Sequence, residues 1–219
     1  LFWDVAEDEA HNNKFHPVRD YLDGLTWDGT PRLDRWLIDY GGAENTEYVR
    51  AVGAIVLTAA VRRVRQPGCK FDEMLVLESP QGANKSSALA ALAGPDEWFS
   101  DDLPLCADGK RVIESLAGHW IVEAGELRGM RNADVEHLKS LLSRRVDRAR
   151  MSYDRIRSDV PRQCVLVGTT NSENYLRDQT GNRRFWPVRI DCFDLEALRR
   201  DRDQLWAEAA HREAQGGSI

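Results

Sequence analysis

The sequence predicts an α/β fold in which helices flank a mostly parallel β-sheet, preceded by a helical subdomain. In residues 1–70, apolar side chains recur at three- and four-residue spacing, which is typical of amphipathic helices. From Phe71 onward, short apolar runs alternate with helical segments, the pattern of parallel sheets. Residues 76–89 (VLESPQGANKSSAL) follow the strand, loop, Lys-Ser, helix layout of a P-loop. We therefore expect a helical subdomain at 1–70 and a P-loop core of the nucleoside triphosphatase type at 71–219.

Composition indicates a globular protein with a substantial core. The chain has 219 residues, of which 42% are hydrophobic and 30% charged. No apolar run reaches membrane-spanning length, and the first residues (LFWD) do not resemble a signal peptide. The four cysteines contain no Cys-x-x-Cys pair, which favours reduced thiols and a cytoplasmic protein and argues against a structural zinc. Because the chain lacks an initial Met and ends in GGSI, we expect it to be a fragment of a longer protein.

Three helices are predicted in the N-terminal subdomain, at residues 17–22, 33–40 and 47–65. A turn at 27–31 (WDGTP) separates the first two, and Gly41-Gly42 ends the second. The third is amphipathic and ends in three arginines, which suit the negative end of the helix dipole: Arg62, Arg63 and Arg65.

The second part of the chain predicts four buried strands and four helices. The strands are expected at residues 73–79, 119–127, 162–171 and 185–190. The helices are expected at residues 85–92, 110–116, 134–145 and 194–212.

The candidate P-loop matches the pattern G-x-x-x-x-G-K-[ST] imperfectly, because Ser79 and Asn84 occupy the glycine positions. Asn tolerates the left-handed backbone conformation well, and Gly82 leaves one flexible point in the loop. Lys85 would contact the terminal phosphates, and the Ser86 hydroxyl would bind Mg²⁺. The predicted nucleotide-binding residues are Gln81, Gly82, Ala83, Asn84, Lys85, Ser86 and Ser87. The competing interpretation is an ordinary strand, turn and helix with a surface lysine.

Polar groups follow the second and third predicted strands of the core. The carboxyl ends of parallel strands share one edge of a sheet, where ligands bind. Glu123 and Glu126 lie at the end of one strand; one acid can order the Mg²⁺ ligands and the other can act as the catalytic base. Glu126 is the preferred base and Glu123 the preferred metal ligand, although their roles could be exchanged. Asn171, at the end of the next strand, is placed to bind the γ-phosphate or the attacking water.

These segments resemble the virulence-associated E family. The resemblance extends from about residue 16 to residue 209, and its most specific part is the run DQTGNRRFWP at 178–187. The other matching segments are WDG at 27–29, PGCK at 67–70, HWIVEAGEL at 119–127, PRQC at 161–164, GTTN at 168–171 and LWAEA at 205–209.

The resemblance implies an ATP-driven motor that acts on DNA during replication of a mobile element. Proteins of this family occur in phages, prophages and pathogenicity islands, and they are similar to superfamily 3 helicases and other ring-forming ATPases. A primase-like domain often accompanies them. The implied ligands are ATP and Mg²⁺, and the implied partners are single- or double-stranded DNA and further copies of the chain in a ring. The departures at Ser79 and Asn84 concern the rate of hydrolysis more than the fold.

Arg183 and Arg184 precede the last predicted strand. By resemblance to ring ATPases, one of them would act on the γ-phosphate of a neighbouring subunit, where an arginine stabilises transition-state charge. The sequence does not choose between them. The alternative is a solvated pair beside an edge strand.

An arginine-rich segment lies between the second and third strands, in a chain whose net charge is −6 and whose pI is about 5.5. Because the chain is acidic overall, DNA contact would have to come from such a local patch. Its predicted DNA-binding residues are Arg144, Arg145, Arg148, Arg150, Tyr153, Arg155 and Arg157. Superfamily 3 helicases carry a DNA-gripping loop in the corresponding insertion. Ion pairs between subunits, or a contact of Arg148 or Arg150 with the nucleotide, are the competing interpretations.

Two alternatives to a motor are open at this point. One is a nucleotide-binding switch or assembly protein that hydrolyses ATP poorly. The other is a DNA-binding module with a degenerate P-loop. The five histidines show no metal-ligand spacing, and no Ser/His/Asp or Cys/His nucleophile is indicated.

Overall fold

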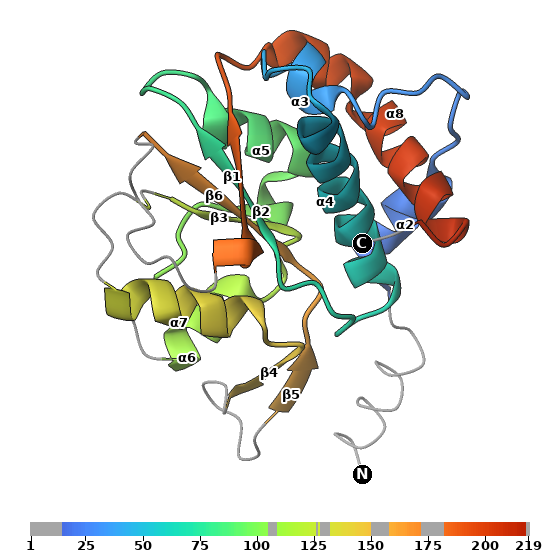
Figure 1. The fold of residues 1–219 in the computed structure, drawn as a ribbon. Helices are drawn as coiled ribbons and strands as arrows, with labels where there is room; N and C mark the ends of the chain where they lie inside the picture. The colour runs from blue at the N-terminus through green and yellow to red at the C-terminus, as the bar shows by residue number, and fades with distance from the viewer. Residues whose placement is uncertain are drawn as a thin grey trace.

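The computed structural model describes residues 15–104, 109–125, 127, 132–149, 158–171 and 182–217, and its centre is a parallel sheet with helices on both faces (Figure 1). Its α-helices are α2 (Pro17–Gly24), α3 (Trp36–Asp39), α4 (Glu47–Arg65), α5 (Lys85–Ala93), α6 (Gly109–Leu116), α7 (Asn132–Leu142) and α8 (Leu195–Ala214). Its strands are β1 (Met74–Glu78), β2 (Phe99–Ser100), β3 (Ile121–Ala124), β4 (Val146–Ala149), β5 (Ser158–Pro161), β6 (Val165–Thr170) and β7 (Phe185–Arg189). Two 3₁₀ helices are η1 (Asp96–Trp98) and η2 (Asn182–Arg184). None of the helices in the described part of the chain has both the length and the apolar run that crossing a bilayer requires.

The five strands of the main sheet are all parallel and lie in the order β2-β3-β6-β1-β7. This confirms the predicted parallel sheet. β1 is an interior strand, because Leu77 pairs with Thr169 of β6 on one side and Val188 of β7 on the other. The loop that follows β1 therefore begins in the interior of the carboxyl edge of the sheet.

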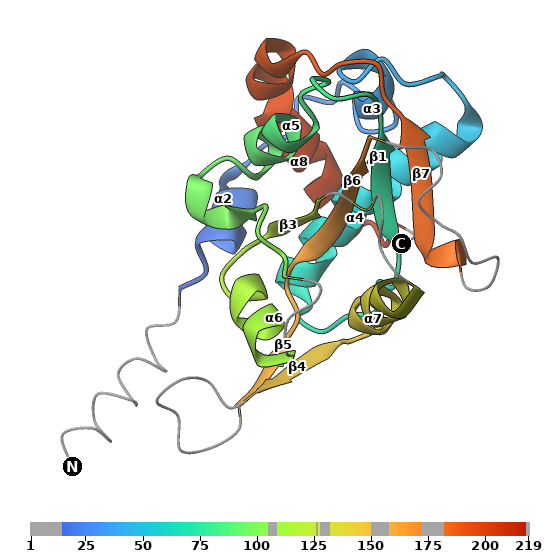
Figure 2. The same cartoon turned by 90° about the vertical axis from the view of Figure 1, so that its left-hand side faces the viewer.

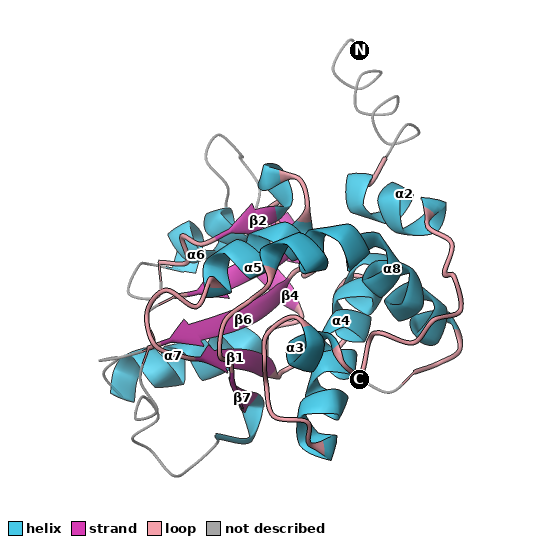
Figure 3. Ribbon diagram, turned by 90° about the horizontal axis from the view of Figure 1, so that it is seen from above, coloured by secondary structure: helices cyan, strands magenta, loops and turns pink. Residues whose placement is uncertain are grey.

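Alternation along the strands divides the core into two clusters, one on each face of the sheet. In β1, Leu75 and Leu77 pack with α4, α5 and α8, whereas Met74 and Val76 pack with α6 and α7. Figures 1 and 2 show α6 and α7 on one side of the sheet and α4, α5 and α8 on the other. Seen from above, α8 lies beside α4 (Figure 3). The result is a three-layer α/β/α core.

The third N-terminal helix has the bounds that the sequence predicts, and Thr46 caps it by accepting a hydrogen bond from the Val49 amide at 3.2 Å. The second is shorter than predicted, since α3 has only four residues. The Leu33 amide donates to the carboxylate of Glu208 on α8 at 2.8 Å, and residues 33–35 form a turn. The Glu208 carboxylate of a distant helix thus accepts hydrogen bonds from the amides of Arg32 and Leu33, where the sequence predicts the start of the helix.

The arginines at the end of α4 join the layers of the fold as well as suiting the helix dipole. Arg63 is buried and donates to the carbonyls of Phe71 at 2.5 Å and Cys164 at 3.2 Å. Arg62 and Arg65 form ion pairs with Glu213 of α8. These contacts tie the N-terminal helices to both the sheet and the C-terminal helix.

The helices before residue 70 share one hydrophobic cluster with α5, α8 and the sheet. Trp120, directly before β3, illustrates this sharing: its indole N–H donates to the Ala60 carbonyl of α4 at 3.0 Å. The same ring lies 4.1 Å from the ring of Trp206 on α8, between centroids. The division into domains at residue 70 stays a prediction.

Two features of the fold were not predicted. β2 has only two residues, too few to give a periodic signal, and it pairs with β3 at the edge of the sheet. β4 and β5 form a separate antiparallel hairpin inside the segment that the sequence marks only as arginine-rich. Figures 1 and 2 show this hairpin at the end of the molecule away from α5.

Candidate functional site

The loop between β1 and α5 (residues 79–84, the β1–α5 loop) has a left-handed backbone at Asn84, as the substitution of Asn for glycine suggests. Asn84 has φ of 58° and ψ of 27°, and it is the one non-glycine residue with positive φ in the described part of the chain. Gly82 also has positive φ, 90°. The left-handed region is costly for most side chains and least so for Asn and Gly. Asn84 therefore adopts the left-handed backbone conformation at the position where the P-loop pattern has its second glycine.

The side chain of Asn84 also ties the loop to the segment after β7. Its amide nitrogen lies 3.5 Å from the Phe193 carbonyl, and the Phe193 amide donates to the Ala83 carbonyl at 3.2 Å. Glycine could adopt the same φ but could not supply the first of these contacts. The loop is thus held from two directions, by β1 and by the chain that leads into α8.

The N-terminus of α5 opens toward this loop. The Asn84 carbonyl accepts the first helical hydrogen bond, from Ala88 at 2.9 Å, and its side chain makes no cap. The amides of residues 85–87 therefore have no intrahelical acceptor, and the helix dipole adds positive potential to them. Ser86 and Ser87 are exposed, as are Gln81 and Gly82 of the loop. The arrangement is suited to an anion such as a phosphate.

Lys85 is buried, which contradicts the surface lysine of the competing interpretation. Its side chain is only 9% exposed and lies in a cluster of oxygen atoms. Its Nζ donates to Ser79 Oγ at 2.7 Å, to the Ser79 carbonyl at 3.1 Å and to the Pro80 carbonyl at 3.3 Å. Asn171 Oδ1 accepts a further hydrogen bond at 2.9 Å. Desolvation lowers the pKa of Lys85 below its ordinary value, and the charge of Glu123 partly offsets this effect.

Glu123 of β3 points to the face of the sheet that α5 covers. It is 3% exposed, and its Oε1 accepts hydrogen bonds from Ser86 Oγ at 2.8 Å and from Thr169 Oγ1. Its Oε2 is buried and has no hydrogen-bond partner among the described residues. A buried carboxylate oxygen without a donor is costly, and a cation or water next to it would satisfy it.

These oxygens fit Mg²⁺. A carboxylate and a hydroxyl are the hard ligands that Mg²⁺ prefers, and the ion usually adds substrate phosphates and water to one or two protein ligands. In the described part of the chain, no three His, Cys, Asp or Glu side chains are grouped around a common point. Ser86 and Glu123 would therefore hold the ion together with a bound nucleotide rather than in a closed protein site.

The structure brings four of the predicted residues together: Lys85, Ser86, Glu123 and Asn171. Glu126, the preferred catalytic base, lies outside the described residues. Sequence reasoning missed Ser79 and Thr169 as contacts of Lys85 and Glu123. The alternation of β6 could have indicated Thr169, because it shares a strand face with Val167 and Asn171.

Arg183 and Arg184 lie at the opposite edge of the sheet. They form part of η2, directly before β7, and the first residue of β7 pairs with Met74 at the start of β1. The length of β1, five residues or about 16 Å, separates that edge from the β1–α5 loop. Arg183 is exposed, whereas the Nε atom of Arg184 is buried without a partner among the described residues. The structure therefore does not bring these two arginines together with Lys85, Ser86, Glu123 and Asn171 within one chain.

The arginine-rich segment forms the β4–β5 hairpin and the turn before it. Arg145 Nε donates to the Gly68 carbonyl at 2.7 Å, and Arg144 is partly buried. Arg148 pairs with Asp159 across the hairpin at 3.2 Å, with both side chains more than half exposed. The remaining predicted DNA contacts lie outside the described residues: Arg150, Tyr153, Arg155 and Arg157.

A buried ion pair fixes the base of this hairpin. Arg162 donates to both carboxylate oxygens of Asp147, at 2.9 and 2.5 Å, and also to the Leu141 carbonyl at the end of α7. Arg162 is 2% and Asp147 5% exposed, so the pair is shielded from solvent. This arginine of the basic segment is therefore structural.

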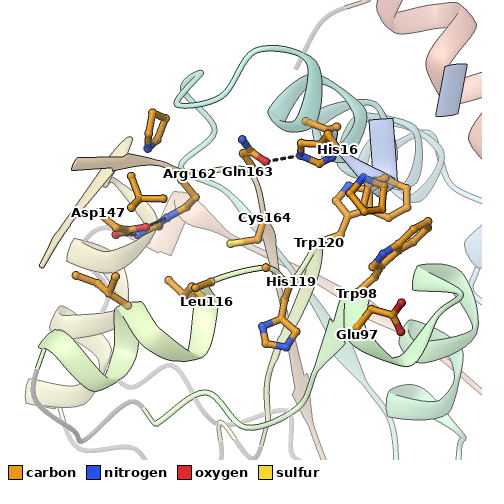
Figure 4. A pocket seen from close by; sticks show the side chains of 18 of the residues that line it. His16, Glu97, Trp98, Leu116, His119, Trp120, Asp147, Arg162, Gln163 and Cys164 are labelled. Carbon is orange, nitrogen blue, oxygen red and sulfur yellow. Dashed lines mark hydrogen bonds and ion pairs between the residues drawn. The ribbon is translucent and has the colours of Figure 1, made fainter. Parts of the chain in front are cut away.

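A cavity of about 660 Å³ lies beside the base of the hairpin, away from the β1–α5 loop. Its lining includes the tryptophans Trp98 and Trp120 together with Cys164. Figure 4 shows His16 and Gln163 at its rim, joined by a hydrogen bond. None of the lining residues belongs to the loop or to α5. No motif in the sequence indicates this cavity, because its walls come from segments far apart in the chain.

Comparisons with known proteins indicate a family and a fold. The model of the virulence-associated protein E-like domain matches residues 22–218. No curated protein matches the chain. The chain is similar to three solved structures of the C-terminal region of NrS-1, each at 12% sequence identity.

The three likenesses differ only slightly. An apo structure of NrS-1 residues 305–718 gives a TM-score of 0.60 and covers 87% of this chain and 48% of that one. Two A form apo structures give 0.59, with 86% and 48% covered, and 0.57, with 85% and 46% covered. At this identity the likeness concerns the fold alone. This chain spans about half the length of the solved structures it matches.

Proposed function

The chain belongs to the virulence-associated protein E-like family, and from this premise we propose that it is a P-loop ATPase that moves on DNA during replication of a phage or other mobile element. The observation that carries the proposal is the convergence of Lys85, Ser86, Glu123 and Asn171 at the carboxyl edge of the sheet. These residues supply a cation, two oxygen ligands and an amide around the open N-terminus of α5. That combination is suited to a nucleoside triphosphate with Mg²⁺.

Each side chain would have a distinct role in hydrolysis. The amides at the start of α5 and the Lys85 ammonium would bind the β- and γ-phosphates, which requires Lys85 to exchange some of its present acceptors for phosphate oxygens. Ser86 and Glu123 would hold Mg²⁺, which supplies charge neutralisation to the transferred phosphoryl group when it is bound. Asn171 would orient the γ-phosphate or the attacking water through its amide. Glu126 is the proposed base.

We propose that the active form is a homo-oligomeric ring. The supporting observation is the position of Arg183 and Arg184, at the edge of the sheet away from the phosphate loop of their own chain. An arginine supplied by a neighbouring subunit would complete the charge stabilisation that this loop lacks.

DNA contact is assigned to the β4–β5 hairpin. Antiparallel hairpins with arginines can reach a DNA backbone, and this hairpin is held at its base by the buried pair of Asp147 and Arg162. Arg148 is exposed there, although it pairs with Asp159 in the described structure. The contact would be electrostatic and therefore sensitive to salt.

A second function, a nucleotide-binding switch that hydrolyses slowly, is favoured by one observation. Ser79 replaces the first glycine of the P-loop pattern, and its hydroxyl holds Lys85 Nζ at 2.7 Å. A bound phosphate would have to compete with this hydroxyl for the ammonium group. Such competition would slow turnover or weaken binding without altering the fold.

ATP turnover by the protein, with and without single-stranded DNA, tests the proposal. The variant Lys85→Ala should lose turnover, because it removes the cation at the phosphates. Lys110→Ala, which removes an exposed lysine on α6, is the matched control and should hydrolyse ATP as the unaltered protein does. DNA-stimulated turnover that depends on Lys85 supports the motor. Tight ATP binding without turnover supports the switch, and no ATP binding would contradict both.

A further inference from the structure

We infer that Thr169 is a positioning residue for Glu123, and this inference rests on the proposed ATPase function. Thr169 is the fifth residue of β6 (Val165–Thr170) and lies two residues before Asn171. Its side chain is 5% exposed and its hydroxyl donates to Glu123 Oε1. Neither the candidate P-loop nor the acidic strand end contains this residue.

The argument begins with the direction of the strands. Val165 and Val167 pack in the cluster that includes α5, so alternate residues of β6 face the same helix. Thr169 and Asn171 continue that face, and Ile121 and Glu123 do the same on the neighbouring strand β3. The hydroxyl and the carboxylate meet because both strands turn their polar ends toward α5.

The two oxygens of Glu123 are consequently in different states. Oε1 accepts hydroxyl protons from Ser86 and Thr169, whereas Oε2 is buried without a partner among the described residues. Two donors on one oxygen fix the plane of the carboxylate and leave the other oxygen available to a metal-bound water or to the ion. Outer partners of metal-binding groups generally act in this way, by setting ligand orientation.

Thr169 also links the two halves of the site. Lys85 is bonded to Asn171, and Ser86, the next residue on α5, is bonded to Glu123. Thr169 connects Glu123 back to the strand that carries Asn171, which closes a circuit of hydrogen bonds across α5, β3 and β6. The hydrogen bonds therefore fix the positions of Lys85 and Asn171 relative to those of Ser86 and Glu123.

The test compares Thr169→Val, which keeps the shape and removes the donor, with Thr169→Ser, which keeps the donor. Nucleotide affinity is measured in EDTA and in Mg²⁺, together with kcat and KM for ATP. For Thr169→Val we expect unchanged affinity in EDTA, and a loss of about 10- to 100-fold in kcat or in the gain of affinity that Mg²⁺ provides. Thr169→Ser should restore both.

The matched control is Thr58→Val, which removes another buried threonine hydroxyl, bonded to the Ala54 carbonyl within α4 at 2.8 Å. It should leave kcat and the Mg²⁺ effect unchanged. If Thr169→Val keeps the kcat and the Mg²⁺ effect of the unaltered protein, the positioning role is wrong while the ATPase proposal stands. If the unaltered protein neither binds nor hydrolyses ATP, the ATPase proposal is wrong and this inference with it.

Discussion

The ammonium of Lys85 donates a hydrogen bond to Asn171 Oδ1 at 2.9 Å, which joins the first residue of α5 to the residue that follows β6. The two residues are 86 positions apart in the chain. The sequence predicts that Lys85 contacts the terminal phosphates and that Asn171 contacts the γ-phosphate or the attacking water; the structure brings the two side chains together, and their roles stay predictions. Lys85 is buried among acceptors, so its charge state and its partners control what the site can bind.

Nucleotide binding should weaken at a lower pH than it would if Lys85 had the pKa of an ordinary lysine. Burial lowers the pKa of Lys85 below its ordinary value of 10.5, so the free protein loses this charge first as the pH rises. Phosphate binding favours the charged form, and affinity should therefore fall as the pH rises through the lowered pKa. Titration of a non-hydrolysable ATP analogue at increasing pH measures this. In Lys85→Arg the guanidinium stays charged, so affinity should be flat over the same interval. Equal pH profiles for the two proteins would contradict the prediction.

Asn84 should tolerate glycine better than alanine. Its φ of 58° is left-handed, where a Cβ costs about 1–2 kcal/mol for residues other than Gly and Asn. Because glycine adds entropy to the unfolded chain, the net advantage of Asn84→Gly over Asn84→Ala should be about 1 kcal/mol in the free energy of unfolding. Urea denaturation without nucleotide measures both variants. At Ser87, inside α5, the order should reverse, since a helical position favours alanine. Alanine more stable than glycine at both sites would show that Asn84 is not held in the left-handed conformation.

Asp147→Ala should be far more destabilising than Arg148→Ala on the same strand. Asp147 pairs with Arg162 in the interior, and its removal leaves a buried guanidinium without a carboxylate, a cost of about 3–5 kcal/mol. Arg148 pairs with Asp159 in solvent, where such pairs contribute about 1 kcal/mol or less. Chemical denaturation distinguishes the two. Similar small losses would mean that the hairpin base is open to water. Asp147→Asn, which keeps an acceptor, should fall between them.

Arg183→Ala or Arg184→Ala should abolish ATP hydrolysis. Mixing that variant with the Lys85→Ala protein should restore hydrolysis. A Lys85→Ala chain has a dead phosphate loop but intact arginines, so it can supply an arginine to a neighbour whose own loop is intact. Arg183 is the first candidate, because its side chain is exposed. Turnover of each arginine variant is measured alone and after mixing with Lys85→Ala. Absence of recovery in both mixtures would count against an arginine acting between subunits.

Much of the fold follows from the sequence, because long apolar periodicities and glycine or proline stops are local signals. The helix at 47–65 and the order of strands and helices in the core are cases of this kind. β2 escapes prediction because two residues carry no period. The β4–β5 hairpin escapes because its strands, VDRA and SDVP, are stabilised by pairing and by the buried Asp147 rather than by an apolar face.

Sequence reasoning anticipated that Lys85, at the start of α5, would lie near Glu123 and Asn171 at the ends of two strands, because residue type and element ends are local signals. The chemical roles of these residues stay predictions. Hydroxyl groups that contact the site are harder to predict, since Ser and Thr occur throughout the chain. Only tertiary packing brings Ser79 to Lys85 and Thr169 to Glu123. The burial of Arg162 is likewise set by distant elements. Its position in a basic segment would instead suggest an exposed side chain.

The interior position of β1 in the sheet has a consequence for folding during synthesis of the chain. β1 and its loop are synthesised well before β6 and β7, the two strands that pair with them, and before Phe193, which holds Ala83. Pairings between distant segments form slowly, and an apolar strand without partners is prone to aggregation in the meantime. The conformation of the β1–α5 loop therefore depends on segments that are synthesised after it. A chain that ends before β7 would carry every residue of the loop but would lack the β7 pairing and the Phe193 contact that hold it.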